Sequence, residues 1–194
     1  MALKGTLEER IARVARETIA IMPYDPQWPG RFESEARRLR SSLPPSLVNR
    51  IEHFGSTAVP GLAAKPVVDM LVEVSSLEMT RQLAAPLLEA EGYDYFWRPE
   101  PPDGPAMYAW FIKRDAVGHR THHVHMVEAA SRMWDALFFR DYLRQFPEEA
   151  ARYAALKTSL SQQFRNDREG YTRGKTDFVI AVTQRAKRYY GAAE

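Results

Sequence analysis

Asp69 stands in a stretch of the sequence that otherwise has the composition of a buried strand. Residues 67 to 74 read Val-Val-Asp-Met-Leu-Val-Glu-Val, a run rich in β-branched and apolar side chains with turn residues before it. A carboxylate in such a strand is costly to bury unless it is paired, hydrogen-bonded or bound to a cation. We therefore expect Asp69 either to bind a divalent metal or to pair with an internal arginine or lysine.

A Gly55-Ser56 pair ends the preceding predicted strand and opens a loop of small residues that leads to Asp69. Glycine lets the backbone approach a phosphate closely, and the serine hydroxyl and nearby amides can donate hydrogen bonds to it. Side chains alternate along a strand, so Asp69, Leu71 and Glu73 share one face. A carboxylate beside such a loop is how polymerase-type sites hold a metal for in-line attack on a nucleotide. The alternative for the Gly-Ser pair is a plain turn.

Three of the five histidines lie in the segment Arg120-Thr-His-His-Val-His125. On a strand His123 and His125 share one face, and His122 lies on the other. Two imidazoles at positions i and i+2 can bind one divalent ion, or one of them can act as an acid or base. The alternative is a pair of hydrogen-bonded histidines at the surface of a sheet. His53 is a further candidate, for which a structural role is equally open.

Basic residues near the C-terminus and in the Gly-Ser loop form a third group. Lys175 begins the last predicted helix with Arg173 just ahead of it, and Lys65 lies in the loop before the acidic strand. A lysine reaches a triphosphate as a mobile point charge, so we predict that Lys65, Arg173 and Lys175 neutralise phosphates. The alternatives are a solvated helix end for the C-terminal group and a structural role for Lys65.

Composition places the chain among single-domain globular proteins. Its 194 residues are 45% apolar and 27% charged, with a net charge of +2 and no cysteine. Disulfides and thiolate chemistry are thereby excluded, and the mixed charge argues against dedicated nucleic-acid binding. No apolar run is long enough for a membrane span and no signal-peptide pattern is present, so we expect no membrane partner and a cytoplasmic location.

Hydrophobic periodicity predicts one α+β domain over residues 1–194, with a mostly antiparallel or mixed sheet and helices before and after it. Strands are predicted at 19–22, 51–54, 67–74, 93–97, 106–113 and 120–127, the last two as a hairpin. Helices are predicted at 6–18, from Phe32 to about 43, and at 77–91, 131–146, 147 to about 166, and 175–190. Residues 98–105 form a proline-dense loop, either a lid or a plain connection.

Longer motifs give the sequence a recognisable family resemblance. They are Pro23-Tyr-Asp-Pro-Gln-Trp-Pro29, Glu52-His-Phe-Gly-Ser-Thr-Ala-Val-Pro-Gly-Leu-Ala-Ala-Lys-Pro-Val-Val-Asp69, and Arg120-Thr-His-His-Val-His125. The closing segment from Tyr171 to Phe178 also fits. Together, over about 19–190, they resemble the GrpB family, which implies a nucleotidyltransferase-type core in which a mixed sheet carries the active-site strand pair.

The resemblance also defines one departure. Nucleotidyltransferases of this superfamily have a Gly-Ser or Gly-Gly pair, then an Asp-x-Asp or Asp-x-Glu strand, and a third acid on a later strand. The Gly-Ser pair and Asp69 match, but Leu71 stands where the second acid is expected. Glu73 lies about 6.5 Å from that position by the rise of a strand, too far to substitute without rearrangement. The standard two-metal mechanism is therefore not expected here.

The leading hypothesis is a nucleotidyltransferase-like protein that binds a nucleoside triphosphate with a divalent metal and transfers a nucleotidyl group to an unknown acceptor. Asp69, His123 and His125 hold the metal or act as base, and the mixed ligands suit Mn²⁺ or Zn²⁺ better than Mg²⁺. The rival is a non-catalytic nucleotide- or CoA-type ligand-binding or chaperone-like module, which the missing acid favours. GrpB-like domains also occur fused to dephospho-CoA kinases. A metal-dependent hydrolase is a third, less supported alternative.

Overall fold

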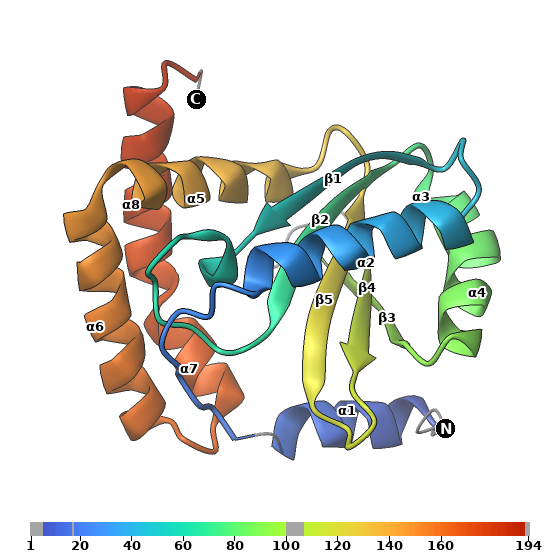
Figure 1. Ribbon diagram of the computed structural model, residues 1–194, viewed down its shortest axis with the longest axis horizontal. Helices are drawn as coiled ribbons and strands as arrows, with labels where there is room; N and C mark the ends of the chain where they lie inside the picture. The colour runs from blue at the N-terminus through green and yellow to red at the C-terminus, as the bar shows by residue number, and fades with distance from the viewer. Residues whose placement is uncertain (1–5, 17, 100–106, 193–194) are drawn as a thin grey trace.

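A five-stranded sheet lies at the centre of the structure, a computed structural model that describes residues 6–16, 18–99 and 107–192 (Figure 1). The strands are arranged in the order β1-β2-β5-β4-β3. Their bounds are β1 (Val48–Phe54), β2 (Val68–Val74), β3 (Asp94–Pro99), β4 (Met107–Arg114) and β5 (Arg120–Val127). Only β2 and β5 pair in parallel, and the other neighbours are antiparallel. The predicted α+β class with a mixed sheet is therefore confirmed.

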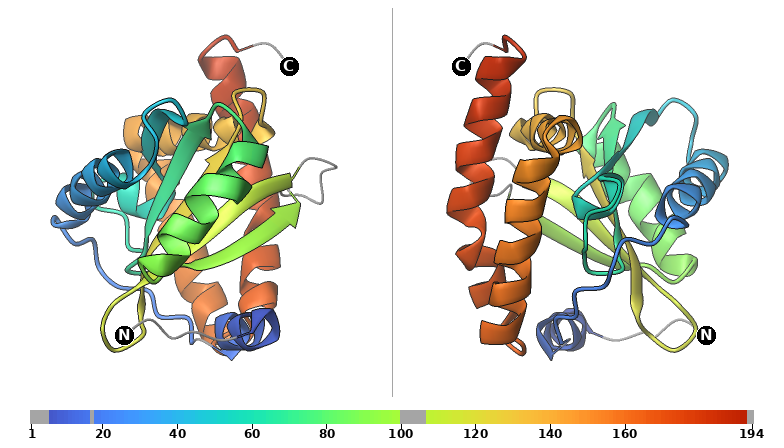
Figure 2. Two further views of the ribbon diagram at one scale, coloured as in Figure 1. Left: turned by 90° about the vertical axis from the view of Figure 1, so that its right-hand side faces the viewer. Right: turned by 60° about the vertical axis from the view of Figure 1, so that its left-hand side comes forward.

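Helices flank this sheet on two sides (Figure 2). One side carries α2 (Trp28–Ser42) and a segment made of α3 (Leu77–Met79), the π-helical turn η2 (Thr80–Ala84) and α4 (Ala85–Ala90). The other side carries η3 (Arg132–Trp134), α5 (Asp135–Gln145), α6 (Pro147–Gln163), α7 (Arg168–Gly174) and α8 (Thr176–Tyr189). The remaining elements are α1 (Leu7–Arg16) and the 3-10 turn η1 (Ser56–Ala58). Within the described ranges no helix is both long and apolar enough to cross a membrane.

Side chains of β2 alternate between the two faces of the sheet, and the two faces have different surroundings. Met70 and Val72 are fully buried in the main core, where Leu39 of α2 and Leu88 of α4 also lie. Burial of such side chains contributes roughly 1.5–3 kcal/mol each and fixes the register of the strand, because a slip by one residue would bring Asp69 into this core. Asp69 therefore faces the side that carries the C-terminal helices.

The C-terminal helices are joined to the loop between β1 and β2 by a second core. Phe139 and Leu143 of α5, Tyr153 of α6 and Val182 of α8 belong to this cluster, and Val59 and Leu62 of the loop complete it. The loop after Gly55-Ser56 is consequently packed between sheet and helices, which holds it in one position beside β2.

Several boundaries differ from the sequence prediction. Residues 19–22 do not form a strand; only an isolated bridge joins Met22 to Ala64, because Pro23 stops further pairing. Helix α2 begins at Trp28, before the predicted Phe32, since Pro29 fits the first helical turn. The predicted helix at 77–91 is interrupted by η2, and most of the 98–105 loop lies outside the described residues.

Helix α7 is an element that the sequence analysis missed. Its N-cap is Asp167, whose side chain accepts a hydrogen bond from the amide of Gly170. Glycines at both 170 and 174 weaken the helical signal, because glycine is a poor helix former. The helix matters because it carries Tyr171 and leads into Lys175, the cap residue of α8.

Candidate functional site

Asp69 and Gly55 approach each other so closely that only glycine fits at position 55. Gly55 follows the last residue of β1 and has φ +70°, a conformation that L side chains rarely adopt. A Cβ atom placed there would lie 2.5 Å from Oδ2 of Asp69. The Gly-Ser turn thus runs directly against the carboxylate, as the sequence predicted. The side chain of Asp69 stays 29% exposed, so a ligand can reach it.

The parallel pairing of β2 with β5 brings both predicted histidines to the same face. Asp69 stands opposite His123 in the register, and Leu71 stands opposite His125. Ligand atoms of Asp69, His123 and His125 all lie within 4.8 Å of one another. The three residues proposed from the sequence as metal ligands are therefore neighbours, and His125 lies beside the position where the second acid was expected.

The two imidazoles differ in the nitrogen atoms they leave available. His123 Nδ1 lies 3.0 Å from Asp69 Oδ1, and because a carboxylate accepts, this nitrogen carries the proton. The other nitrogen, Nε2, lies 3.3 Å from a guanidinium nitrogen of Arg120 and accepts from it. His125 Nδ1 is buried and has no hydrogen-bond partner among the described residues. A buried nitrogen without a partner is costly, so this atom is suited to a ligand.

Aromatic rings surround His125 and explain its burial. Tyr108 stacks on the imidazole with ring centroids 5.5 Å apart, and Phe54 meets it edge-on at 5.3 Å. Leu71 is fully buried in the same cluster, together with Trp110. A carboxylate at position 71 would lie among these apolar groups, where it would be costly without a cation.

The protonation states of Asp69, His123 and His125 at neutral pH are those that metal ligands require. Burial alone would raise the pKa of Asp69, but the hydrogen bond from His123 and nearby positive charge lower it to about 2. Burial lowers the pKa of His123 to about 4 and that of His125 to about 3, against the opposing charge of Asp69. At neutral pH the site therefore presents one carboxylate and two neutral imidazoles, so a metal need displace no proton from His125 to bind it.

Lysines lie near this group, and two of them approach the same aromatic ring. Lys65 and Lys175 approach the ring of Tyr171, with Nζ atoms 5.4 and 5.1 Å from its centroid. Within the described part of the chain neither Nζ atom has a hydrogen-bond or ion-pair partner. Burial lowers the pKa of Lys65, and nearby Arg168 and Lys175 lower it further. Two partly buried basic groups without a counter-ion nearby are a favourable environment for an anion.

A third lysine was missed by the sequence analysis. Lys157 on α6 is 2% exposed, donates a hydrogen bond to the carbonyl of Ala63 at 2.5 Å and lies over the ring of Tyr153. Burial and repulsion from Lys175 lower its pKa to about 7. A signal for it exists in the sequence, because Tyr153, Lys157 and Leu160 share one helical face and a lysine in an apolar stripe is unusual.

The remaining predicted residues divide into those at the site and those away from it. Ser56 opens η1 beside Asp69, and its side chain hydrogen-bonds Tyr153. Arg173 is different, because its side chain is 72% exposed and pairs with Glu169 on the surface of α7. This surface pairing gives no support to a phosphate-binding role for Arg173, which stays a prediction. Glu73 hydrogen-bonds Asn49, at a distance of two residues from Leu71.

Fold and site together define an α+β protein in which an Asp-His-His cluster lies beside a glycine-serine turn and unpaired lysines. Comparison with protein families adds the identification: the family model described as GrpB protein matches residues 18–185. The chain belongs to the GrpB family, in agreement with the resemblance seen in its motifs.

Individual relatives are similar to this chain over most of its length. A UPF0157 protein of Pseudomonas aeruginosa is 42% identical over 181 residues, which cover 92% of this chain and 72% of that protein. The crystal structure of conserved protein GrpB from Enterococcus faecalis superposes with a TM-score of 0.76 at 32% identity, covering 88% of this chain and 99% of that one. A dephospho-CoA kinase of Mycolicibacterium paratuberculosis is 30% identical over 199 residues, covering 90% of this chain and 47% of the kinase.

Proposed function

We propose that this protein binds a nucleoside triphosphate with a divalent metal and transfers the nucleotidyl group to a hydroxyl-bearing acceptor. The observation that carries this proposal is the placement of Asp69 against the Gly55 turn on one side and His125 on the other, near Lys65 and Lys175, whose side chains have no partner among the described residues. The order of strand, Gly-Ser turn and acidic strand supports a nucleotidyltransferase-type site.

The phosphates have a natural place in this arrangement. Lys65 and Lys175 attract the terminal phosphates, because their side chains have no hydrogen-bond or ion-pair partner among the described residues. Gly55 lets a phosphate approach the turn, and the hydroxyl of Ser56 donates a hydrogen bond to it. In the reaction an acceptor oxygen forms a bond to the α-phosphorus, the bond to the β-phosphate oxygen breaks, pyrophosphate leaves, and the acceptor's proton passes to water.

Asp69 and His125 fit a divalent metal, since His125 Nδ1 is a buried nitrogen without a hydrogen-bond partner among the described residues. His123 orients Asp69 through its Nδ1 hydrogen bond and completes the ligand set only if that bond is given up. Mixed nitrogen and oxygen ligands favour Mn²⁺ or Zn²⁺ over Mg²⁺. When bound, such an ion supplies positive charge that polarises the phosphate under attack.

The experiment that tests transfer uses a triphosphate labelled at the α-phosphate. The protein is incubated with it, Mn²⁺ and a panel of small hydroxyl compounds and proteins, and label on an acceptor is measured with release of pyrophosphate. Label transferred by wild type and absent with His125→Ala supports the proposal. Tight binding of the triphosphate without any transfer or pyrophosphate release contradicts it.

The second candidate is a non-catalytic module that binds a nucleotide or a CoA-type ligand, or assists another enzyme. Leu71 favours this candidate. It is buried among aromatic rings at the position where two-metal catalysis would use a second carboxylate. The similarity of this chain to part of a dephospho-CoA kinase is consistent with a CoA-type ligand. This candidate predicts saturable binding of such ligands with no turnover in the same assay.

A further inference from the structure

Helix α5 places two arginines at the two ends of the Gly-Ser turn. Arg140 donates from one guanidinium nitrogen to the carbonyl of His53 at 2.9 Å, and Arg144 donates from Nε to the carbonyl of Ala58 at 2.9 Å. The four residues between these carbonyls include Gly55 and Ser56. One helix therefore holds the turn on both sides of the residues that are proposed to contact phosphate.

The contact of Arg140 with His53 satisfies a backbone carbonyl of the edge strand β1. Because β1 is an edge strand, the backbone groups on its outer side have no neighbouring strand to pair with. Arg140 is 10% exposed and also pairs with Glu52 at 2.8 Å, while Asp141 accepts from both arginines. Hydrogen bonds from charged donors are stronger than neutral ones, so this pairing fixes the turn more firmly than backbone bonds alone.

Contacts through His53 and Thr57 also hold the turn, on the side away from α5. The imidazole Nε2 of His53 lies 3.0 Å from the hydroxyl of Thr57, which in turn lies 3.4 Å from the carbonyl of Val67. Phe32 of α2 stacks on His53, with centroids 4.8 Å apart and planes at 9°. The carbonyls of His53 and Ala58 are thus the points at which α5 sets the position of the turn.

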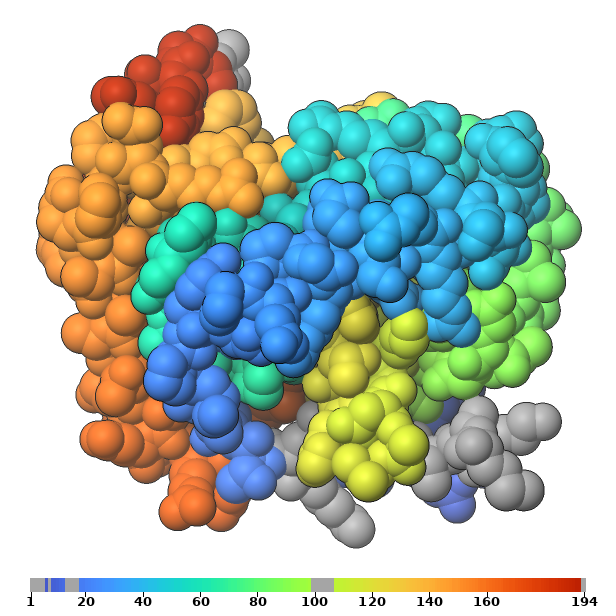
Figure 3. Space-filling view, in the orientation of Figure 1, coloured from blue at the N-terminus to red at the C-terminus, as the bar shows by residue number. Residues whose placement is uncertain are grey.

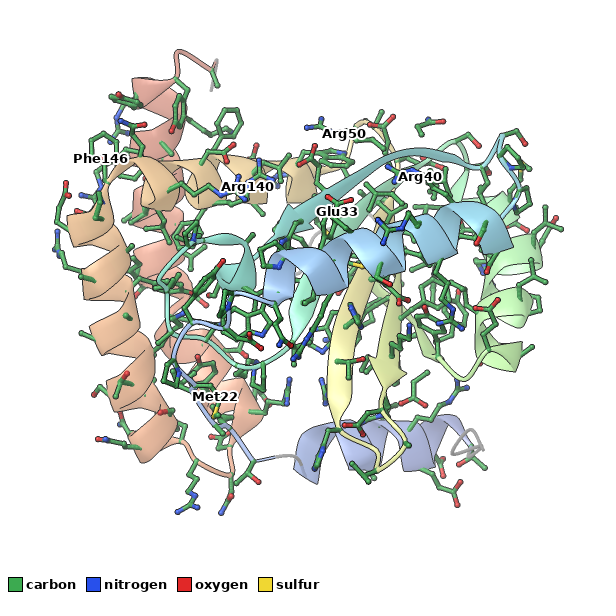
Figure 4. All side chains as sticks on the ribbon, in the orientation of Figure 1. Met22, Glu33, Arg40, Arg50, Arg140 and Phe146 are labelled. Carbon is green, nitrogen blue, oxygen red and sulfur yellow. The ribbon has the colours of Figure 1, made fainter. Side chains whose placement is uncertain are left out.

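Solvent reaches this clamp through a pocket of about 280 Å³. The pocket is lined by Arg140 and Arg144 from α5, by Glu52 and His53 from β1, and by Phe32 and Glu33 from α2. In Figure 3, β1 is visible between α2 and α5, and Figure 4 shows Arg140 and Glu33 on the two flanking helices. We expect a small guanidinium compound to enter here when an arginine side chain is removed.

We propose that Arg140 and Arg144 are positioning residues, which hold the Gly55-Ser56 turn against Asp69 so that its amides and the serine hydroxyl meet a phosphate. The consequence for ligand affinity rests on the proposed function, whereas the effect on the turn itself does not. Arg144 is the better residue to change, because it is 40% exposed and its removal leaves the buried pair of Arg140 and Glu52 intact.

The test compares Arg144→Ala with Arg152→Ala; Arg152 is an exposed arginine on α6 that pairs with Glu149 and with no other described residue. Hydrogen exchange is followed at the amides of Ala58 and Val59, which donate to the carbonyls of Gly55 and Ser56. Loss of one charge-assisted bond should raise exchange at these amides by roughly tenfold in Arg144→Ala and leave it unchanged in the control. Equal exchange in the two variants would overturn the proposal.

A second readout separates positioning from general destabilisation. With ATP and Mn²⁺ as the probe, Arg144→Ala should bind the triphosphate about tenfold more weakly and Mn²⁺ alone as wild type does, with affinity restored by millimolar methylguanidine. Equal loss of both affinities, or no response to methylguanidine, contradicts a positioning role. If wild type binds no triphosphate, the proposed function fails, and the exchange measurement still decides whether the clamp exists.

Discussion

Replacing Gly55 by alanine tests whether the turn and the carboxylate form one site. The new methyl group would lie 2.5 Å from Oδ2, 3.0 Å from Cβ and 3.1 Å from Cγ of Asp69. Asp69 belongs to β2, which pairs with strands on both sides, so its backbone has little freedom to move. The clash is therefore expected to displace the carboxylate or the turn.

The magnitude follows from two contributions. Gly55 has φ +70° and ψ −170°, a region reserved for glycine, and an alanine there costs about 1–3 kcal/mol. Overpacking against the carboxylate adds about 1–3 kcal/mol. Gly61 is the matched control, because it has φ +76° but nothing within 4 Å of an added Cβ, and so it carries only the backbone cost.

The assay is urea unfolding of Gly55→Ala and Gly61→Ala, combined with Mn²⁺ binding measured by electron paramagnetic resonance. Gly55→Ala should lose at least about 1 kcal/mol more of the free energy of unfolding than the control, from the overpacking term. It should also weaken Mn²⁺ binding, which Gly61→Ala should not. Equal losses of stability and unchanged Mn²⁺ binding in both variants would refute the reasoning.

Two further predictions concern charge. Burial lowers the pKa of His53 from 6.5 to about 4, so its neutral form stabilises the fold above pH 6.5 and that contribution is lost as the pH falls towards 4. When the pH is lowered from 7.5 to 5, the free energy of unfolding measured with urea should fall by about 2 kcal/mol more in the wild type than in His53→Phe. Identical decreases in the two proteins would show that His53 does not titrate this way. Lys65→Ala and Lys175→Ala should each weaken ATP binding roughly 10- to 100-fold and AMP binding far less, from the loss of one charged partner. Arg173 pairs with Glu169 in solvent, so Arg173→Ala should bind ATP as wild type does; a comparable loss of ATP binding in this variant would show that Arg173 belongs to the site.

The sequence was sufficient for the centre of the fold because its signals there are strong and local. The run from Val67 to Val74 has the composition of a buried strand, and period-two alternation correctly places Asp69, Leu71 and Glu73 on one face. The same alternation separates His123 from His122 on β5. Boundaries failed where tertiary contacts decide them, as at 19–22, where no strand lies beside the segment.

The composition of the site was harder to predict, because proximity between distant segments is set by packing. Lys157 reaches the loop only because α6 packs against Val59 and Leu62, a contact that no local pattern shows. Arg173 and Lys175 look equivalent in the sequence, but the end of α7 turns one into solvent and the other towards Tyr171.

The arginine clamp was invisible for the same reason. Arg140 lies 87 residues from His53 in the chain, and Arg144 lies 86 residues from Ala58. Spacing along the helix gives only an i, i+4 pair of like charges, a pattern typical of a solvated helix face. These arginines differ from others because they donate to the carbonyls of His53 and Ala58, and those contacts exist only in the folded protein.

The measurement that tests the central claim most directly is calorimetric binding of ATP, GTP, CTP and UTP in the presence of Mn²⁺ or Mg²⁺, on wild type and Asp69→Asn. Asparagine keeps the shape of the side chain and removes its charge, so circular dichroism should report an unchanged fold. We predict that wild type binds at least one triphosphate in a metal-dependent manner and that Asp69→Asn loses this binding by tenfold or more. Equal binding by the two proteins, or no binding of any triphosphate by wild type, would contradict a nucleotide site at Gly55, Ser56 and Asp69.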